Sequence, residues 1–175
     1  PLWKAETLVD VGSGGGLPGV PIALVRPDLD MSLVEATGKK AVFLRKAVES
    51  LGMEHCVVHN ARVENLGQEP GHRERYACAT ARALAPLPVL AEYCLPLVRV
   101  GGFVLAMKAE PGRQELERGK GAARALGARV SDVVEVPLLP CAGTKRRSLI
   151  VMTKDGPTPG RYPRRPGMAK KRPLG

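Results

Sequence analysis

Residues 7–19, with the sequence TLVDVGSGGGLPG, decide the fold of this 175-residue chain. The apolar residues at 8–11 predict a strand buried on both faces of a parallel sheet, interrupted only by Asp10. Glycines after such a strand allow positive φ angles and a close approach of the backbone to a ligand. A helix that starts at Pro18 would point its free N–H groups at that ligand. The stretch therefore predicts a strand, a ligand-binding turn and a helix.

The glycine spacing is compatible with two cofactors. Gly14, Gly16 and Gly19 satisfy G-x-G-x-x-G, the dinucleotide pattern, whereas Gly12, Gly14 and Gly16 give G-x-G-x-G behind Asp10. A carboxylate at the end of a buried strand needs a partner. Either Asp10 meets the ammonium of S-adenosylmethionine, or it accepts N–H groups of the glycine turn. The first alternative predicts that Asp10→Ala weakens cofactor binding more than folding.

Composition favours one globular domain. Hydrophobic residues make up 44% of the chain, and no apolar run approaches the roughly 18 to 20 residues that span a bilayer. Without a signal pattern either, a soluble, cytoplasmic protein is expected. Four cysteines are scattered without a C-x-x-C pair, which predicts reduced, mostly buried thiols and no metal site; they are Cys56, Cys78, Cys94 and Cys141.

The positive charge is concentrated at the end of the chain. The formal net charge is +10, and the segment 156–175 holds six Lys or Arg residues and no acid. Such a segment attracts polyanions, and its five prolines predict an extended arm that can lie along a groove. The alternative is a solubilising tail. We expect a folded domain over 1–155 and a basic, proline-rich tail over 156–175.

Alternating segments predict an α/β sheet. The expected strands after the first are 30–35, 57–58, 76–80, 103–107, 130–136 and 148–153. The expected helices are 18–26, 39–51, 86–98 (interrupted by Pro88 and Pro96) and 114–126, with a turn at Gly101 and Gly102. The last two strands lack a helix between them, so they should form an antiparallel hairpin. A mostly parallel seven-stranded sheet with an antiparallel terminal hairpin is the class I methyltransferase (Rossmann-like) layout.

Three side chains follow the expected strands. Glu35 ends the second strand, where an acid accepts hydrogen bonds from ribose hydroxyls; it could instead cap the following helix. Asn60 opens a polar turn suited to an adenine edge, or caps a short helix. Arg82 lies at the carboxyl end of a central strand, where open α/β sheets bind ligands.

With these motifs placed, the chain closely resembles the RsmG (GidB) family, which methylates guanine N7 in the small-subunit (16S) ribosomal RNA. The matching stretches are 8–19, 25–27, 38–40, 43–44, 61–64, 81–83, 107–108, 146–151 and the ending 157–167. Family members have a helical amino-terminal segment before the glycine strand, whereas only residues 1–6 precede that strand here. A histidine common in the last hairpin is replaced by Ser148.

The resemblance implies a role for each matching position. Gly12, Gly14, Gly16 and Leu17 would lie at the methionine part of S-adenosylmethionine, with Asp10 behind them. Glu35, Ala36 and Thr37 would line the ribose, and Val63 and Glu64 the adenine. Arg82 would mark the place where cofactor meets RNA.

Guanine N7 carries an in-plane lone pair and no proton, so methyl transfer needs no general base. The protein has to hold N7 in line with the methyl–sulfur bond and exclude water. Arginine suits guanine and phosphate recognition because it binds bidentately. The expected RNA-binding residues are Lys108, Lys145, Arg146, Arg147, Arg164 and Arg165. For any one of them the alternative is a solvated basic loop.

Aromatic residues for base stacking make up only 3% of the chain. Either an arginine plane stacks on the base, or the RNA arrives already shaped in a ribosomal particle. Two other functions fit parts of the sequence: an NAD-dependent oxidoreductase that uses Gly14, Gly16 and Gly19, and a non-catalytic RNA-binding module for ribosome assembly. We expect a monomer.

Overall fold

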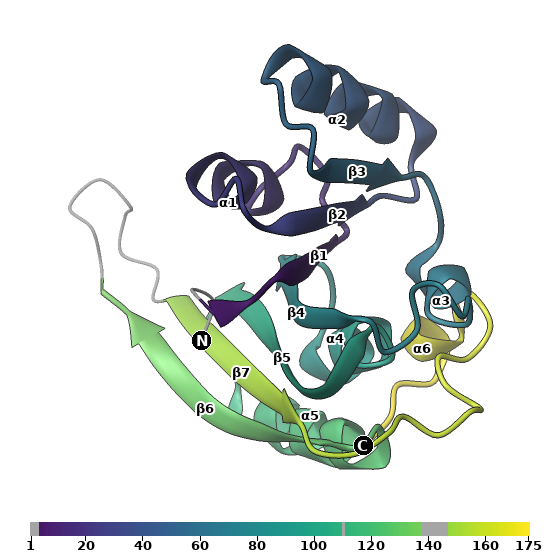
Figure 1. Cartoon of the computed structure of the whole chain (residues 1–175). Coiled ribbons are helices and arrows are strands. Elements are labelled where there is room, and N and C mark those ends of the chain that lie inside the picture. The colour runs from purple at the N-terminus through teal and green to yellow at the C-terminus, as the bar shows by residue number, and fades with distance from the viewer. Residues whose placement is uncertain (1–3, 110, 138–146) are drawn as a thin grey trace.

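Seven strands form one mixed sheet in the order β3-β2-β1-β4-β5-β7-β6 (Figure 1). The computed structural model describes residues 4–109, 111–137 and 147–175. The strands are β1 (Thr7–Val11), β2 (Asp30–Val34), β3 (Cys56–His59), β4 (Tyr76–Arg82), β5 (Val98–Ala109), β6 (Ala128–Val136) and β7 (Arg147–Lys154). The helices of the described ranges are α1 (Gly19–Val25), α2 (Gly38–Ser50), α3 (Val63–Leu66), α4 (Leu87–Cys94), α5 (Arg113–Ala125) and α6 (Met168–Lys171).

Strands β1 to β5 are parallel, and β1 lies at the centre of this part of the sheet. Val11 pairs with Val34 of β2 on one side, and Asp10 pairs with Thr80 of β4 on the other. Because these strands are parallel, the carboxyl ends of β1, β2 and β4 lie at one edge of the sheet. The strand order reverses between β1 and β4. Open α/β sheets bind ligands at such a reversal point.

The other end of the sheet is antiparallel. β7 runs antiparallel to both β5 and β6, with Ile150 beside Ala106 and Leu149 beside Val134. β6 and β7, which follow each other in the sequence, therefore form the expected antiparallel pair. The α/β class, with a mostly parallel seven-stranded sheet and an antiparallel terminal hairpin, is confirmed.

Helices cover both faces of the parallel strands. On one face, α1 and α2 bury Ala23 and Leu44 against Leu8 of β1. On the other, α4 and α5 pack Leu90 and Ala122 into a second core that includes the neighbouring β1 residues. Residues 8–11 are thus at most 1% exposed, as their nearly continuous apolar run predicted.

Two boundaries differ from the expectation. α4 ends at Cys94, well short of 98, because Pro96 has no N–H with which to continue the helix. β5 begins at Val98 and runs through Gly101 and Gly102, which therefore lie inside a strand and not in a turn. A Cβ on Gly102 would lie 2.6 Å from the carbonyl oxygen of Ala77, so glycine is required where β5 passes β4 closely.

The C-terminal segment 156–175, which was expected as an extended arm that can lie along a groove, is packed against the domain. Arg73 donates hydrogen bonds to the carbonyl oxygens of Tyr162 (2.6 Å) and Thr158 (2.8 Å). Arg164 forms an ion pair with Glu92 of α4. Proline-rich backbone leaves many carbonyl oxygens without an internal partner, and here side chains of the domain supply the donors.

The buried thiols fit the expectation for three of the four cysteines: Cys56, Cys78 and Cys94 are buried and free, and Cys141 lies outside the described residues. Burial raises the pKa of Cys56 to about 11. In the part of the chain that the structure describes, the helices lack the length and apolar character for crossing a bilayer. The same ranges contain no cluster of three His, Cys, Asp or Glu side chains arranged for a metal ion.

Candidate functional site

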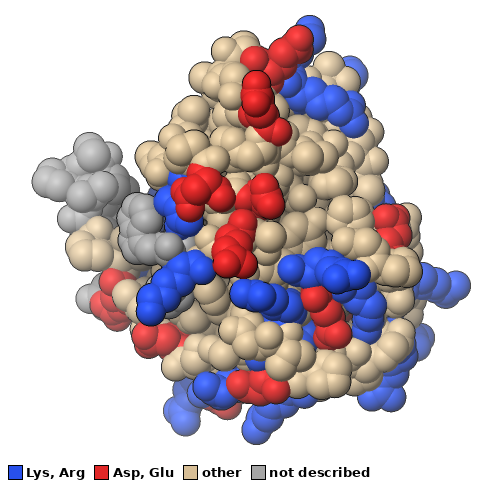
Figure 2. Space-filling view, in the orientation of Figure 1, with Lys and Arg blue, Asp and Glu red and all other residues tan. Residues whose placement is uncertain are grey.

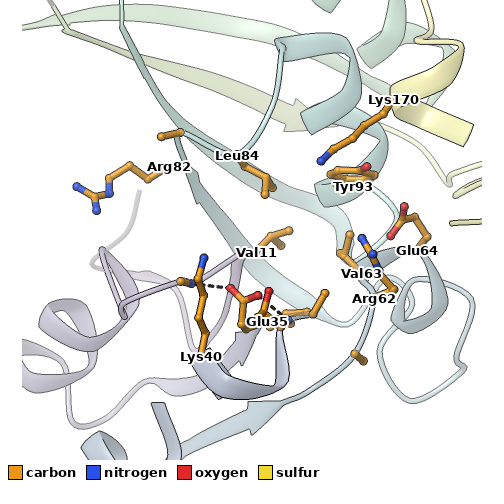
Figure 3. A pocket seen from close by; sticks show the side chains of 17 residues that line it. Val11, Glu35, Lys40, Arg62, Val63, Glu64, Arg82, Leu84, Tyr93 and Lys170 are labelled. Atoms are coloured by element: carbon orange, nitrogen blue, oxygen red, sulfur yellow. Dashed lines mark hydrogen bonds between the residues drawn. The ribbon is translucent and has the colours of Figure 1, made fainter. Parts of the chain in front are cut away.

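A cavity of about 350 Å³ lies at the carboxyl ends of β1, β2 and β4 (Figure 3). Most of the expected cofactor residues line it: Gly12, Gly14, Glu35, Ala36, Thr37, Val63, Glu64 and Arg82. They come from four separate segments of the sequence, which the sheet topology brings together at the reversal point. Asp10, Gly16 and Leu17 are not part of its wall.

The glycine turn has the backbone conformation that the sequence predicted. Gly12, Gly14 and Gly16 have φ angles of +72°, +57° and +91°. Residues with a Cβ atom rarely adopt such positive φ angles. The N–H groups of Gly12 and Ser13 donate to the carbonyl oxygen of Val34 at 2.9 and 3.1 Å, which ties the turn to the end of β2. A Cβ on Gly12 would lie 2.5 Å from Leu84 Cδ1, so any side chain there would intrude on the cavity wall.

Glu35 joins the glycine turn to the start of α2. Its Oε2 accepts a hydrogen bond from Gly14 N at 3.0 Å, and its Oε1 accepts one from Thr37 N at 2.7 Å. Burial by itself would raise the pKa of Glu35, but the bonds from Thr37 and Gly14 and the charge of Lys40 hold it below its usual range. Each carboxylate oxygen keeps a lone pair for a further donor. Figure 3 shows this carboxylate on the cavity wall below Val11.

Asn60 bridges two strands. Its Nδ2 donates to the carbonyl oxygen of Glu35 at 2.9 Å. The N-cap of α3 is Arg62, so the interpretation of Asn60 as a helix cap is wrong. The bond fixes the end of β3 against the end of β2, beside the carboxylate of Glu35.

Asp10 lies beneath the glycine turn and not in the cavity. It is 1% exposed, and its Oδ1 accepts a hydrogen bond from Thr80 Oγ1 at 2.8 Å. A Cβ on Gly19 would lie 2.8 Å from its Oδ2, so the start of α1 covers this oxygen. Burial raises the pKa of Asp10 in spite of the bonds from Thr80 and Ser13. The N–H groups of Gly12 and Ser13 donate to Val34, and that of Gly14 donates to Glu35, so these groups do not go to Asp10. The contact of Asp10 with a ligand ammonium stays a prediction.

Gly16 and Leu17 face away from the cavity. A Cβ on Gly16 would lie 2.7 Å from Val20 Cγ2 and 3.3 Å from Leu44 Cδ2, so its role is the close packing of α1 on α2. Leu17 is 48% exposed. The glycine motif thus serves the cavity through Gly12 and Gly14 and serves helix packing through Gly16.

Arg82 stands between this cavity and a second one. The second cavity, of about 830 Å³, is lined by Arg82 together with Pro86, Met107, Lys108, Arg147 and Leu149. Arg82 is exposed at the end of β4, and Figure 3 shows its guanidinium directed away from Glu64 and Tyr93. The next residue, Ala83, has φ +50°, a left-handed conformation that is costly for alanine. The chain turns sharply at Ala83, and Arg82, the residue before this turn, lines both cavities.

Two of the expected RNA-binding cations have partners within the protein. Lys108 Nζ lies 2.6 Å from Glu115 Oε1 and donates to the carbonyl oxygen of Ala85 at 3.0 Å. Although burial raises the pKa of Glu115, hydrogen bonds from Lys108 and from Leu87 N lower it below its usual range. Lys108 therefore holds the loop after β4 against α5, with its charge balanced by Glu115.

Arg164 is the second such cation. Its Nε and Nη2 donate to the two carboxylate oxygens of Glu92 at 2.8 and 2.5 Å. Glu92 is fully buried. By contrast, Arg147 and Arg165 are exposed, and Lys145 and Arg146 lie outside the described residues. Of the four expected RNA-binding residues that the structure describes, Arg147 and Arg165 have exposed side chains that are accessible to a polyanion.

Several cavity residues were missed from the sequence: Lys40, Arg62, Leu84, Tyr93 and Lys170. Lys40 could have been found, because it lies in the first turn of α2 after Glu35 and Thr37. Tyr93 lies inside an apolar helix, and Lys170 lies in the segment 156–175 that was expected to be a basic, proline-rich tail. No local pattern pointed to either.

A parallel sheet with this strand order, a glycine turn and an acid after β2 around a cavity at the reversal point, and an antiparallel last hairpin define a class I methyltransferase of the S-adenosylmethionine-dependent type. Solved structures support the fold. An antibiotic-resistance methyltransferase, Kmr, matches with a TM-score of 0.68 at 20% identity, covering 87% of this chain and 88% of that one. Geranyl diphosphate methyltransferase in complex with SAM matches with a TM-score of 0.64 at 16% identity, covering 85% and 78%.

The sequence comparisons are more specific. The family model GidB, described as rRNA small subunit methyltransferase G, matches residues 2–142. A protein of Rubrobacter xylanophilus called ribosomal RNA small subunit methyltransferase G is 56% identical over 99% of this chain and 67% of its own length. One with the same description from Pelotomaculum thermopropionicum is 49% identical over 99% and 72%. The chain belongs to the GidB family of rRNA small subunit methyltransferase G.

Proposed function

We propose that this protein transfers the methyl group of S-adenosylmethionine to N7 of a guanine in the small-subunit ribosomal RNA. The observation that carries the proposal is the position of Arg82, which lines both the cavity of about 350 Å³ and the cavity of about 830 Å³. Family membership argues for a methyltransferase and against both an oxidoreductase and a non-catalytic RNA-binding module.

The residues of the first cavity fit the cofactor. Glu35 offers two carboxylate oxygens with free lone pairs to the ribose hydroxyls. Gly12 leaves open the space that a Cβ would fill beside Leu84, as a methionine chain requires. Val63 and Glu64 at the far end would face the adenine. When bound, S-adenosylmethionine supplies a methyl group made electrophilic by its sulfonium.

The second cavity fits a purine base. Its wall combines apolar surface from Pro86, Met107 and Leu149 with the guanidinium groups of Arg82 and Arg147. A guanidinium can donate to guanine O6 or to a phosphate. For N7 to attack, its own lone pair has to stay free, so we assign Arg82 to O6 or to the phosphate. No proton leaves N7 during the transfer, and positioning and exclusion of water are then the main contributions of the protein.

Surface charge supports a polyanionic partner. The chain has a net charge of +10, and on the face shown in Figure 2 the Lys and Arg side chains gather mainly in the lower half, with Asp and Glu between and above them. Binding that releases counterions from RNA would weaken with salt. An rRNA substrate also fits the cytoplasmic location that we propose, with the protein acting as a monomer on RNA or on a ribosomal particle.

The test is Arg82→Ala. The control is Arg99→Ala, because Arg99 is exposed near the start of β5, at the amino ends of the parallel strands. We expect methylation of small-subunit particles, followed with radiolabelled S-adenosylmethionine and mapped to guanine N7, to fall more than about 100-fold in Arg82→Ala. Cofactor affinity, measured by calorimetry, should fall only a few-fold. Full methylation by Arg82→Ala would remove the assignment, as would methylation at another atom.

A further inference from the structure

The C-terminal segment 156–175 holds α3, the helix that contains Val63 and Glu64, in place through hydrogen bonds. Gly167 N donates to Glu64 Oε1 at 3.0 Å, and Gln68 Nε2 donates to the carbonyl oxygen of Pro163 at 2.8 Å. A Cβ on Gly67 would lie 2.8 Å from Pro163 Cγ, so the two segments are in close contact. Glu64 is only 4% exposed. The position of α3 therefore depends on residues 163–167.

A second anchor holds the same segment over α4. Arg164 contacts the fully buried Glu92 through its backbone N–H (2.9 Å) as well as its guanidinium, and its Nη2 also donates to the carbonyl oxygen of Arg172 at 2.8 Å. One arginine thus connects α4 with both ends of the turn that contains α6. Ala169 of α6 is 1% exposed, which fixes the face that α6 buries.

Anchored in this way, α6 places Lys170 on the wall of the first cavity. Lys170 lines that cavity with Glu64, Arg62 and Tyr93, and Lys171 does not. Figure 3 shows the Lys170 side chain extending from α6 towards the ring of Tyr93, at the end of the cavity opposite Arg82. The side chain of Lys170 is exposed, so its ammonium is accessible to a ligand.

The chemistry of this end of the cavity fits an uncharged nitrogen heterocycle. A lysine ammonium has donors only, and the ring nitrogens of adenine are acceptors. Tyr93 adds an aromatic surface beside it. We propose that Lys170 binds the adenine base of S-adenosylmethionine, and that the docking of segment 156–175 and the binding of the cofactor stabilise each other. The inference rests on the proposed cofactor.

The coupling follows from shared contacts. The segment holds α3 through Glu64 and supplies Lys170, so a cofactor that contacts either group binds better when the segment is docked. By linkage, the cofactor must stabilise the docked segment to the same extent.

The test compares Lys170→Ala with Lys171→Ala, an exposed neighbour on the same helix that does not line the cavity. We expect calorimetric titration with S-adenosylhomocysteine, which has the same adenosine part, to show about 5- to 30-fold weaker binding for Lys170→Ala and unchanged binding for Lys171→Ala. Because Lys170 is exposed and lies outside the buried core, melting without ligand should be unchanged in both variants.

Hydrogen exchange gives a second measurement. In the unaltered protein, S-adenosylhomocysteine should slow the exchange of amides in residues 157–175 by about tenfold or more, and less in Lys170→Ala. Equal cofactor affinity for Lys170→Ala and the unaltered protein overturns the inference, even if the KM for RNA rises. If the unaltered protein binds neither S-adenosylmethionine nor S-adenosylhomocysteine, the proposed function itself fails.

Discussion

Replacing Arg164 by alanine tests whether the C-terminal segment belongs to the fold or to the RNA-binding surface. The guanidinium makes two charge-assisted hydrogen bonds to Glu92, whose side chain is fully buried, while the Arg164 side chain is 24% exposed. Removing one partner of a buried pair costs about 3–5 kcal/mol, because the other charge is left without compensation. Water can reach the partly exposed site, and the Arg164 N–H remains on Glu92. We therefore expect a loss of about 2–4 kcal/mol.

Such a loss is a large part of the roughly 5–15 kcal/mol that stabilises a domain. Urea unfolding of Arg164→Ala should show it directly, with Arg165→Ala, the exposed neighbour, within about 0.5 kcal/mol of the unaltered protein. In the double variant Arg164→Ala/Glu92→Gln, part of the loss should return because the amide carries no charge. If Arg164→Ala unfolds like Arg165→Ala and yet methylates RNA poorly, then Arg164 is an RNA ligand and the structural argument is refuted.

Three further substitutions have expected outcomes. Glu35→Gln should weaken S-adenosylhomocysteine binding in calorimetry by about 10- to 100-fold, because the charged acceptor of the ribose is lost. The pKa of Glu35 is lower in the folded chain than in the unfolded chain. The ionised carboxylate therefore stabilises the fold fully above the ordinary carboxyl pKa, and this stabilisation is lost as the pH falls through the lower folded value. When the pH is lowered from about 6 to about 3, the unfolding free energy of Glu35→Gln should therefore decrease less than that of the unaltered protein. Ala83→Gly should change stability by no more than about 1 kcal/mol in thermal unfolding, since relief of the left-handed strain at φ +50° offsets the added chain entropy, whereas a clear loss would show that Ala83 is not strained. Asp10→Ala should lower the unfolding free energy by about 1–3 kcal/mol, because the Thr80 hydroxyl loses its acceptor. The binding free energy of the cofactor should change by less than the unfolding free energy. A larger change in binding than in stability would indicate that Asp10 contacts the cofactor.

The parts of the site that the sequence predicted depend on local rules. Gly12 and Gly14 follow a buried strand, and Glu35 follows the next one, so strand order alone brings them together at the carboxyl edge. The sheet itself was predictable for the same reason: alternating segments and one connection without a helix leave few topologies.

The sequence does not reveal which charged side chains have partners that lie far away in the chain. Lys108 and Arg164 were expected to bind RNA because their charge is visible in the sequence, whereas their acidic partners, the half-buried Glu115 and the fully buried Glu92, are not. An acidic residue on an otherwise apolar helix, as Glu92 is on α4, is the signal that was overlooked: a buried carboxylate needs a cation. Lys170 reaches the cavity only through the tertiary packing of α6, which no periodicity reveals.

The contact between Arg164 and Glu92 also has a consequence for how the chain folds as it is made. Residues 158–164 are synthesised after all seven strands, since β7 ends at Lys154. A nascent chain that already holds the complete sheet therefore still carries Glu92 without its cation, and Arg73 without the carbonyl oxygens of Thr158 and Tyr162. Residues 158–164 must therefore leave the exit tunnel of the translating ribosome before Glu92 gains its cation. The cavity that we propose for the methyl donor, which Lys170 also lines, is completed only after the strands that define it have been translated.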